Sequence, residues 1–330
     1  MQRNYSYITL LLLICLLGVS ACQEKEIVTV TPLKGSGFQN DVIKRTLGPN
    51  VVGLDIEFAY AMALPRDMGR ITSAQVEASI SGASGTYLEH RSFYTDGGGA
   101  DVGVVVGQPS ATEGRITRVN FTADTSAATL RYFYRIPEEA RGQSVNFTFS
   151  ATSSNGQTVS YTMGPYTVGK MDLKLDLNVV DAGACYISIA DMAVYTAAQA
   201  AANPDKIDLV YLYRTIPNVT FNHGLVSPAA DAQYRPGITL PAGVNRSIKI
   251  RKAWGIRDFH LARTQFGVYI DDLDFQQLNL EGEPNFAINM RAESGAWVET
   301  ADGRYRAYIY FNAINNGARS ARISIKRYAL

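Results

Sequence analysis

Cysteine is scarce in this sequence, which has three in 330 residues: Cys15, Cys22 and Cys185. The first two lie within the opening 22 residues, so the rest of the chain has one thiol and a disulfide framework is excluded. Cys185 alternates with Ile187 and Ile189, which predicts a buried, inert thiol. The alternative, a catalytic nucleophile, lacks a histidine nearby in the sequence.

The sequence also lacks an excess of charge of either sign. It has 31 Lys and Arg against 30 Asp and Glu, which gives a formal net charge of +1. A nucleic-acid-binding protein usually shows a basic patch or stripe, and an anionic membrane surface attracts the same kind of patch. The charge balance therefore predicts no nucleic-acid partner.

Histidine is rare, and its three positions, His90, His223 and His260, lie far apart in the sequence. None of them stands in a His-x-x-x-His spacing, and the chain has no Cys-x-x-Cys pair. We therefore expect a surface or loop position for each histidine, no metal site and no cofactor.

Catalytic motifs are equally sparse. The sequence has no Gly-x-Ser-x-Gly elbow of the α/β-hydrolase type. Gly164 to Lys170 has the glycine and lysine spacing of a phosphate-binding loop, but Met171 stands where Ser or Thr is required. A strand-like pattern follows in place of the helix that such a loop needs. We predict no catalytic residue and a protein that is not an enzyme.

The apolar run at residues 8–19 is too short to span a bilayer, which requires about 20 apolar residues. Arg3 precedes the run, and Ser20 and Ala21 lead into Cys22, as in a secretory signal with a small-residue cleavage site. The site resembles the bacterial lipobox, in which the cysteine is lipidated and becomes the new N-terminus. We predict a signal peptide at residues 1–21 and a lipid anchor on Cys22. An ordinary signal peptide with a chance cysteine is the alternative.

Residues 22–40 have the composition of a tether, with charged residues first and then Pro, Gly and Ser without a sustained period. Its cluster Glu24-Lys25-Glu26 resembles the acidic export tags of Bacteroidetes surface lipoproteins, although a solvated linker has the same composition. We expect an outer-membrane lipoprotein, on either the cell surface or the periplasmic face.

Alternation of apolar and polar residues dominates the rest of the chain and predicts an all-β protein with two β-sandwich domains. In residues 41–170, three runs alternate most clearly: 52–60, 130–136 and 145–149. Asn155-Gly156 is a hairpin signal between two such runs. Seven or eight short strands in about 120 residues favour an immunoglobulin-like sandwich for this first domain.

The second domain, residues 171–330, is predicted to be β-rich with one short helix. Thr196 and Gln199 fit a capping box at the start of that helix, and Asn203-Pro204 ends it. Strand-like runs occur at 207–213, 248–250, 266–275, 286–290, 305–311 and 323–328. The longer connections, at about 215–245 and 252–264, are the expected places for ligand contacts.

Two tryptophans and an acidic cluster are the candidate ligand-binding residues, and all lie in the second domain. Aromatic faces stack on sugar rings, so an exposed Trp254 or Trp297 would serve as a glycan platform, whereas a buried one would be core. Asp271, Asp272 and Asp274 offer oxygen ligands for calcium or carboxylates for glycoside hydrolysis. A solvated acidic turn at the end of a strand is the alternative for the cluster.

Three stretches resemble a family of Bacteroidetes lipoproteins of unknown function: NDVIKRTLGPNVVGLDIEFAYAMALP, NPDKIDLVYLYR and DGRYRAYIYFNA. The chain is more loosely similar to starch-utilisation outer-membrane lipoproteins, which bind glycans and hand them to an outer-membrane importer. That looser resemblance implies non-catalytic capture of a glycan or other nutrient polymer, without transferring any site residue. The alternatives are a structural or adhesive surface subunit, and a glycoside hydrolase or other hydrolase.

Overall fold

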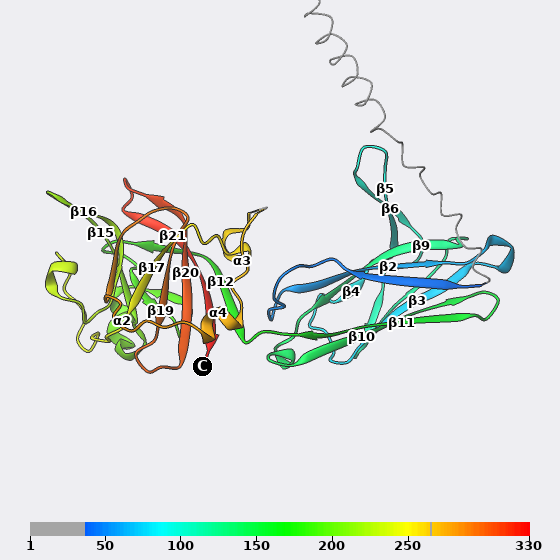
Figure 1. The fold of residues 1–330 in the computed structure, drawn as a ribbon, viewed down its shortest axis with the longest axis horizontal. Coiled ribbons are helices and arrows are strands. Elements are labelled where there is room, and N and C mark those ends of the chain that lie inside the picture. Colours follow the sequence, from blue (N-terminus) through cyan, green and yellow to red (C-terminus); the bar gives the residue numbers. More distant parts are fainter. Residues whose placement is uncertain (1–36, 265) are drawn as a thin grey trace, which may run out of the picture.

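The computed structural model describes residues 37–264 and 266–330. The predicted signal peptide, Cys22 and nearly all of the predicted tether lie outside the described residues. Two lobes are visible, each a sandwich of two antiparallel sheets, and the first lobe has a further two-stranded sheet (Figure 1). The prediction of an all-β fold is confirmed. Among the described residues, no helix combines the length and apolar character that crossing a membrane requires.

The first lobe has the strand order of an immunoglobulin-like sandwich. One sheet runs β1-β2-β9-β4 and the other β11-β10-β3-β8-β7, which matches the ABED and GFC order of that fold, with β8 and β7 added beside C. A hairpin, β5 (Arg91–Thr95) and β6 (Asp101–Val105), projects from the lobe (Figure 1). The sheet strands are β1 (Gln39–Lys44), β2 (Asp55–Ala63), β3 (Ile71–Ala78), β4 (Tyr87–Leu88), β7 (Ala111–Glu113), β8 (Ile116–Asn120), β9 (Ala127–Arg135), β10 (Ser144–Ser153) and β11 (Thr158–Thr167).

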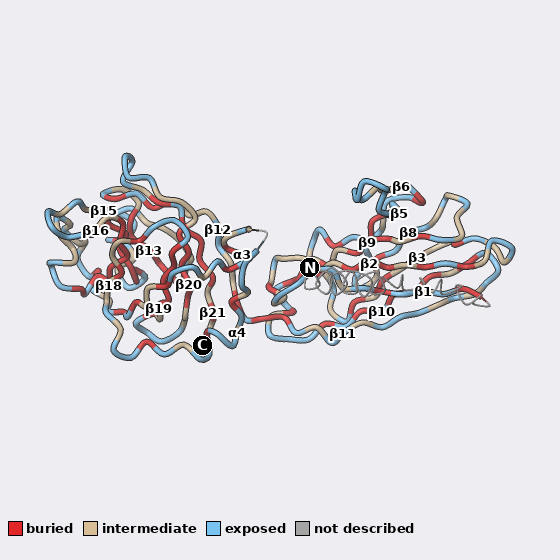
Figure 2. The backbone as a smooth tube through the Cα atoms, turned by 45° about the horizontal axis from the view of Figure 1, so that its top comes forward, coloured by how far each residue is buried: buried red, intermediate tan, exposed pale blue. Residues whose placement is uncertain are grey.

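The alternation seen in the sequence places an aromatic core between these two sheets. Phe58 of β2 packs against Phe147 of β10 with ring centroids 4.9 Å apart, and Phe147 packs equally close to Tyr134 of β9. Buried residues follow the strands in both lobes (Figure 2). The hairpin predicted at Asn155-Gly156 joins β10 to β11, and Gly156 takes a φ of +83° there.

The second lobe is a sandwich of the sheets β12-β21-β20-β19-β17 and β14-β13-β15-β16-β18. Cys185 is buried in its core, as predicted, and burial raises the pKa of the thiol to about 11. The predicted helix is α2 (Ala197–Ala202), with the capping box between Thr196 and Gln199 present. The strands are β12 (Met171–Val180), β13 (Tyr186–Ser188), β14 (Ala193–Tyr195), β15 (Leu209–Ile216), β16 (Val219–Val226), β17 (Ile250–Trp254), β18 (Phe286–Met290), β19 (Ser294–Glu299), β20 (Tyr305–Asn315) and β21 (Ser320–Ala329).

The sheet that contains β20 is buried on both faces. Ile309 and Phe311 of β20 point into the core between the sheets, whereas Tyr308 and Tyr310 point to the opposite side. Residues 255–280 cover that opposite side with two short helices, α3 (Phe259–Ala262) and α4 (Asp272–Gln276). We call this segment the cover. The prediction of a strand at residues 266–275 is therefore wrong, because residues 272–275 belong to α4.

The cover also joins the two lobes. Val51 and Leu54 of the first lobe pack in the same apolar cluster as Met171 and Phe275 of the second. Around that cluster, the Asp172 carboxylate pairs with Arg141 of the first lobe at 2.7 Å and with Arg327 of the second lobe at 3.0 Å. The backbone N–H of Lys170, between β11 and β12, donates to the Asp272 carboxylate at 3.0 Å.

Candidate ligand-binding surfaces

Trp254 lies at the end of β17, an edge strand of its sheet, and is 52% exposed. Lys252, two residues earlier, places its Nζ 4.3 Å from the centre of the Trp254 ring. The same Nζ donates to the carbonyl oxygens of Ile288 (2.5 Å) and Asn289 (2.9 Å) on β18. Because two carbonyls hold the ammonium, its cation–π contact fixes the orientation of an exposed ring.

A second cation lies near this ring, and further polar residues neighbour it along the chain and on β19. Arg291 brings its guanidinium carbon within 6.0 Å of the ring centre. Trp254 pairs with Ser294 on β19, and the preceding Glu293 forms an ion pair with Arg257 at 2.5 Å. An exposed aromatic face bordered by hydrogen-bonding side chains suits a ligand that has both an apolar face and hydroxyl groups. We call this region the Trp254 surface.

Trp297 has a different environment, and its assignment as a binding residue is wrong. It is 8% exposed and points into the cluster under the cover. Tyr308 lies 4.7 Å from its ring centre and Phe275 lies 5.4 Å away, edge-on. With these neighbours covering the indole, it cannot stack on a sugar, and Trp297 is a core residue.

The three aspartates have structural partners. Asp271 accepts from the N–H groups of Leu273 (2.9 Å) and Asp274 (3.3 Å), and Asp274 accepts from the N–H of Asp271 (2.9 Å). This reciprocal pair caps α4, while Asp272 accepts from Lys170 at the junction of the lobes. Within the described residues, the three carboxylates do not form a set that could hold a metal ion. We therefore assign them to capping and to the junction of the lobes, and their role in ligand binding stays a prediction.

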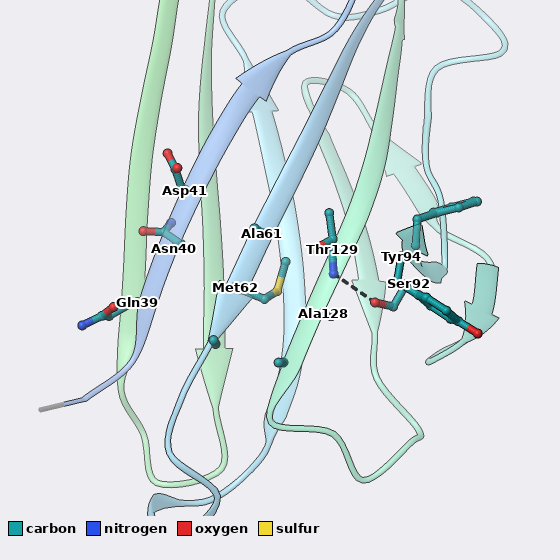
Figure 3. Close-up of a pocket in the computed structure, with 12 residues that line it drawn as sticks. Gln39, Asn40, Asp41, Ala61, Met62, Ser92, Tyr94, Ala128 and Thr129 are labelled. Atoms are coloured by element: carbon teal, nitrogen blue, oxygen red, sulfur yellow. Dashed lines mark hydrogen bonds between the residues drawn. The ribbon is translucent and has the colours of Figure 1, made fainter. Parts of the chain in front are cut away.

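A groove of about 450 Å³ lies on the first lobe, between the outer face of its β1-β2-β9 strands and the β5–β6 hairpin (Figure 3). Tyr94, 55% exposed, lies on the hairpin side. Two polar side chains that line the groove form hydrogen bonds within the protein. The Asn40 amide donates to the Tyr60 hydroxyl (3.2 Å), and the Ser92 hydroxyl accepts from the Thr129 N–H (3.0 Å). Gln39, Asp41 and Thr129 also line the groove.

A buried polar cluster beneath the cover was not predicted from the sequence. Lys326 of β21 and Asp258, the residue before α3, are both fully buried, with Nζ and Oδ2 2.5 Å apart. Nζ also donates to the carbonyl of Ile270 (2.9 Å) and lies 3.3 Å from Nδ1 of His260. Burial lowers the pKa of Lys326, and the neighbouring Asp258 carboxylate opposes that shift. A lysine in an alternating strand gives no signal of burial, because such positions normally face water.

One histidine differs from expectation, whereas His90 lies in the connection between β4 and β5, as predicted. His223 is fully buried on β16, where Nδ1 lies 2.5 Å from the Tyr211 hydroxyl and Nε2 lies 2.8 Å from Oδ1 of Asn316. The prediction of a surface or loop position is therefore wrong for His223. It failed because β16 occupies residues that were assigned to a long connection. His260 lies half-buried on α3.

Family models match both parts of the chain: a domain of unknown function, DUF4466, at residues 35–168, and another, DUF8576, at residues 169–330. No curated protein matches the sequence. The major pilin GBS80 of Streptococcus agalactiae, as a 35 kDa C-terminal fragment, matches at 8% identity and a TM-score of 0.27 over 82% of this chain and 84% of that one. A likeness at that level carries no argument about fold or function.

The crystal structure of a DUF4466 family protein from Parabacteroides merdae is far more similar. It shares 43% sequence identity and a TM-score of 0.84, over 89% of this chain and 99% of that one. The resemblance to a Bacteroidetes family of unknown function is therefore confirmed. On this identity and coverage, the chain belongs to the DUF4466 family.

Proposed function

We propose that this chain is a lipid-anchored outer-membrane protein that binds a glycan or other nutrient polymer without catalysis. The observation that carries the proposal is the Trp254 surface, an exposed indole held by Lys252 and bordered by Arg291. Binding would combine stacking on the indole with hydrogen bonds from the neighbouring polar groups. The lipid on Cys22 and the tether would keep the binding surface concentrated near an outer-membrane importer, the proposed partner.

Replacing Trp254 by alanine tests the binding function. Stacking on an aromatic ring contributes about 1–3 kcal/mol for nucleic-acid bases, and a similar scale for sugars gives a loss of about 5- to 150-fold in affinity. We expect that loss for the polymer that the wild-type mature chain selects from a glycan array, measured by isothermal titration calorimetry.

Tyr94→Ala is the matched control, since Tyr94 is exposed to a similar degree but lies on the other lobe. Because Trp254 is exposed, its removal should change the free energy of unfolding by no more than about 0.5 kcal/mol. Equal affinity of Trp254→Ala and wild type for the selected polymer would refute the proposed role of this surface.

Replacing Cys22 by serine tests the anchor separately. The thiol is the proposed attachment point of the lipid, and several acyl chains are needed for durable membrane binding. We expect Cys22→Ser to move the protein from the membrane fraction to the soluble fraction, as judged by immunoblotting after a salt wash. Retention of the variant in the washed membranes would show that something other than this lipid holds it there.

A further inference from the structure

A cleft of about 510 Å³ lies where the two lobes meet. The second lobe contributes three ring side chains from the cover, Phe259, His260 and Tyr269. Phe259 and Tyr269 lie 5.0 Å apart between ring centres, and His260 lies 5.5 Å from Tyr269. The first lobe contributes residues 45–57, including the charged side chains Arg45, Asp55 and Glu57. Small-ligand sites occur preferentially at such domain interfaces and commonly measure about 300–1,000 Å³.

The cleft is held open in one geometry by close contacts between the lobes. Gly48 of the first lobe packs so tightly on Tyr269 that a Cβ at position 48 would lie 2.3 Å from the tyrosine ring. Its φ of +75° also favours glycine. Val51 and Leu54, at the side of the cleft, are packed into the cluster under the cover. A site whose walls are already in place avoids much of the ordering cost of binding.

His260 supplies a hydrogen-bond donor of fixed position. The Lys326 ammonium can only donate, so His260 Nδ1, 3.3 Å away, must accept and the ring proton is placed on Nε2. Burial and the positive Lys326 lower the pKa of His260 to about 4. The imidazole therefore stays neutral near pH 7 and carries its proton on Nε2, at a residue that lines the cleft.

The charges at the opposite wall cancel locally. Glu57 pairs with Arg45 at 2.8 Å, and Asp55 pairs with Arg135 at 2.7 Å. A paired carboxylate keeps free lone pairs that can accept hydroxyl hydrogen bonds, yet the pair as a whole attracts no net charge. Aromatic faces, one fixed N–H donor and neutralised carboxylates are complementary to a sugar that carries hydroxyl groups and no charge.

Two cavities of similar size elsewhere in the described part of the chain lack this combination. The groove under the β5–β6 hairpin has aromatic side chains but no histidine among its lining residues. A cavity of about 660 Å³ at residues 247–249, 278–282, 299–301 and 306 is lined by no aromatic residue. We infer that the cleft between the lobes is a second saccharide site, which binds a neutral disaccharide or a similarly short neutral saccharide. This ligand class rests on the proposed glycan-binding function, but the site is distinct from the Trp254 surface.

The test uses the full mature chain and five disaccharides: maltose, cellobiose, mannobiose and xylobiose, with acidic digalacturonate as the charged comparison. Affinities are measured by isothermal titration calorimetry at millimolar sugar. We expect at least one neutral disaccharide to bind and digalacturonate to bind more weakly. Phe259→Ala should lower that affinity by about 5- to 150-fold. Leu47→Arg, at a 75% exposed position beside the cleft, should obstruct binding without disturbing a core.

Phe266→Ala is the matched control, because Phe266 belongs to the same cover, is 79% exposed and does not line the cleft. Trp254→Ala should leave disaccharide binding unchanged. The inference is overturned if no neutral disaccharide binds, or if Phe259→Ala and Leu47→Arg both bind as wild type does.

The two hypotheses can fail independently. If the cleft binds no disaccharide but Trp254→Ala still weakens polymer binding, only the inference about the cleft is refuted. If disaccharide binding depends on Phe259 but Trp254→Ala has no effect on any polymer, the cleft is supported and the role of the Trp254 surface is refuted.

Discussion

Replacing Asp258 by alanine should lower the free energy of unfolding of the second lobe by about 3–5 kcal/mol, because removal of one partner leaves a buried charge without its counter-ion. Asp258 also accepts from the N–H groups of Leu261 (3.1 Å) and Ile270 (2.8 Å). Its loss therefore frees two backbone donors and the Lys326 ammonium at once. We expect Asp258→Ala to reach the upper part of this range.

Lys326→Met should lower the free energy of unfolding somewhat less than Asp258→Ala does. Asp258 would keep its two backbone donors, and methionine fills a similar volume.

The control is Lys206→Met, which breaks the 2.9 Å pair of Lys206 with Asp191 at an exposed position. Exposed pairs contribute about 0–1 kcal/mol, so this variant should unfold almost as wild type does. Urea denaturation monitored by fluorescence measures all three. Equal stability of Lys326→Met and Lys206→Met would contradict the buried role of the pair.

Replacing Trp297 by alanine should also destabilise the second lobe strongly. We expect the free energy of unfolding to fall by about 3–5 kcal/mol. The indole packs against Phe275 and Tyr308 beneath the cover, so its removal leaves a cavity that only partial collapse can fill. The measurement is the shift in thermal unfolding, followed by circular dichroism at several heating rates. Below the transition, polymer binding should persist, because the Trp254 surface lies on the other side of its sheet.

Trp254→Ala gives the opposite pattern and is the natural comparison, since it changes the same residue type in the same sheet. It should weaken binding and leave the unfolding temperature nearly unchanged, because 52% of the residue is already exposed. A Trp297→Ala protein that unfolds like wild type would show that the cluster under the cover is loosely packed. It would also reopen the assignment of this tryptophan.

Local patterns predicted much of the fold. In β2, β9 and β10 the apolar residues recur at every second position, and a strand with that period has one face that only a core can bury. Asn155-Gly156 predicted its hairpin, since glycine at a positive φ suits a tight turn. The capping box at Thr196 predicted α2 because its two hydrogen bonds join residues only three apart.

At the acidic cluster, the local sequence pattern led to a wrong prediction of a strand. Its residues carry two local signals, an alternation typical of a strand and a capping pair between Asp271 and Asp274. The pair resembles a capping box, but with aspartate in place of the usual Ser or Thr and Glu or Gln. The segment forms a helix and not a strand because Phe275 is buried against Trp297 and Tyr328. Both of these residues belong to strands that follow Phe275 in the chain.

The sequence by itself determined the all-β class, the alternating core strands, the short capped helix and the buried Cys185, because these depend on residues close together in the chain. Only the tertiary structure decided that Trp297 is buried and Trp254 exposed. The two residues lie on neighbouring, paired strands but on opposite faces of the sheet. Trp297 faces the cover, whereas Trp254 shares the other face with Ile250 and lies at the end of an edge strand. The Lys326–Asp258 pair and the cleft were decided in the same way, since each joins residues far apart in sequence.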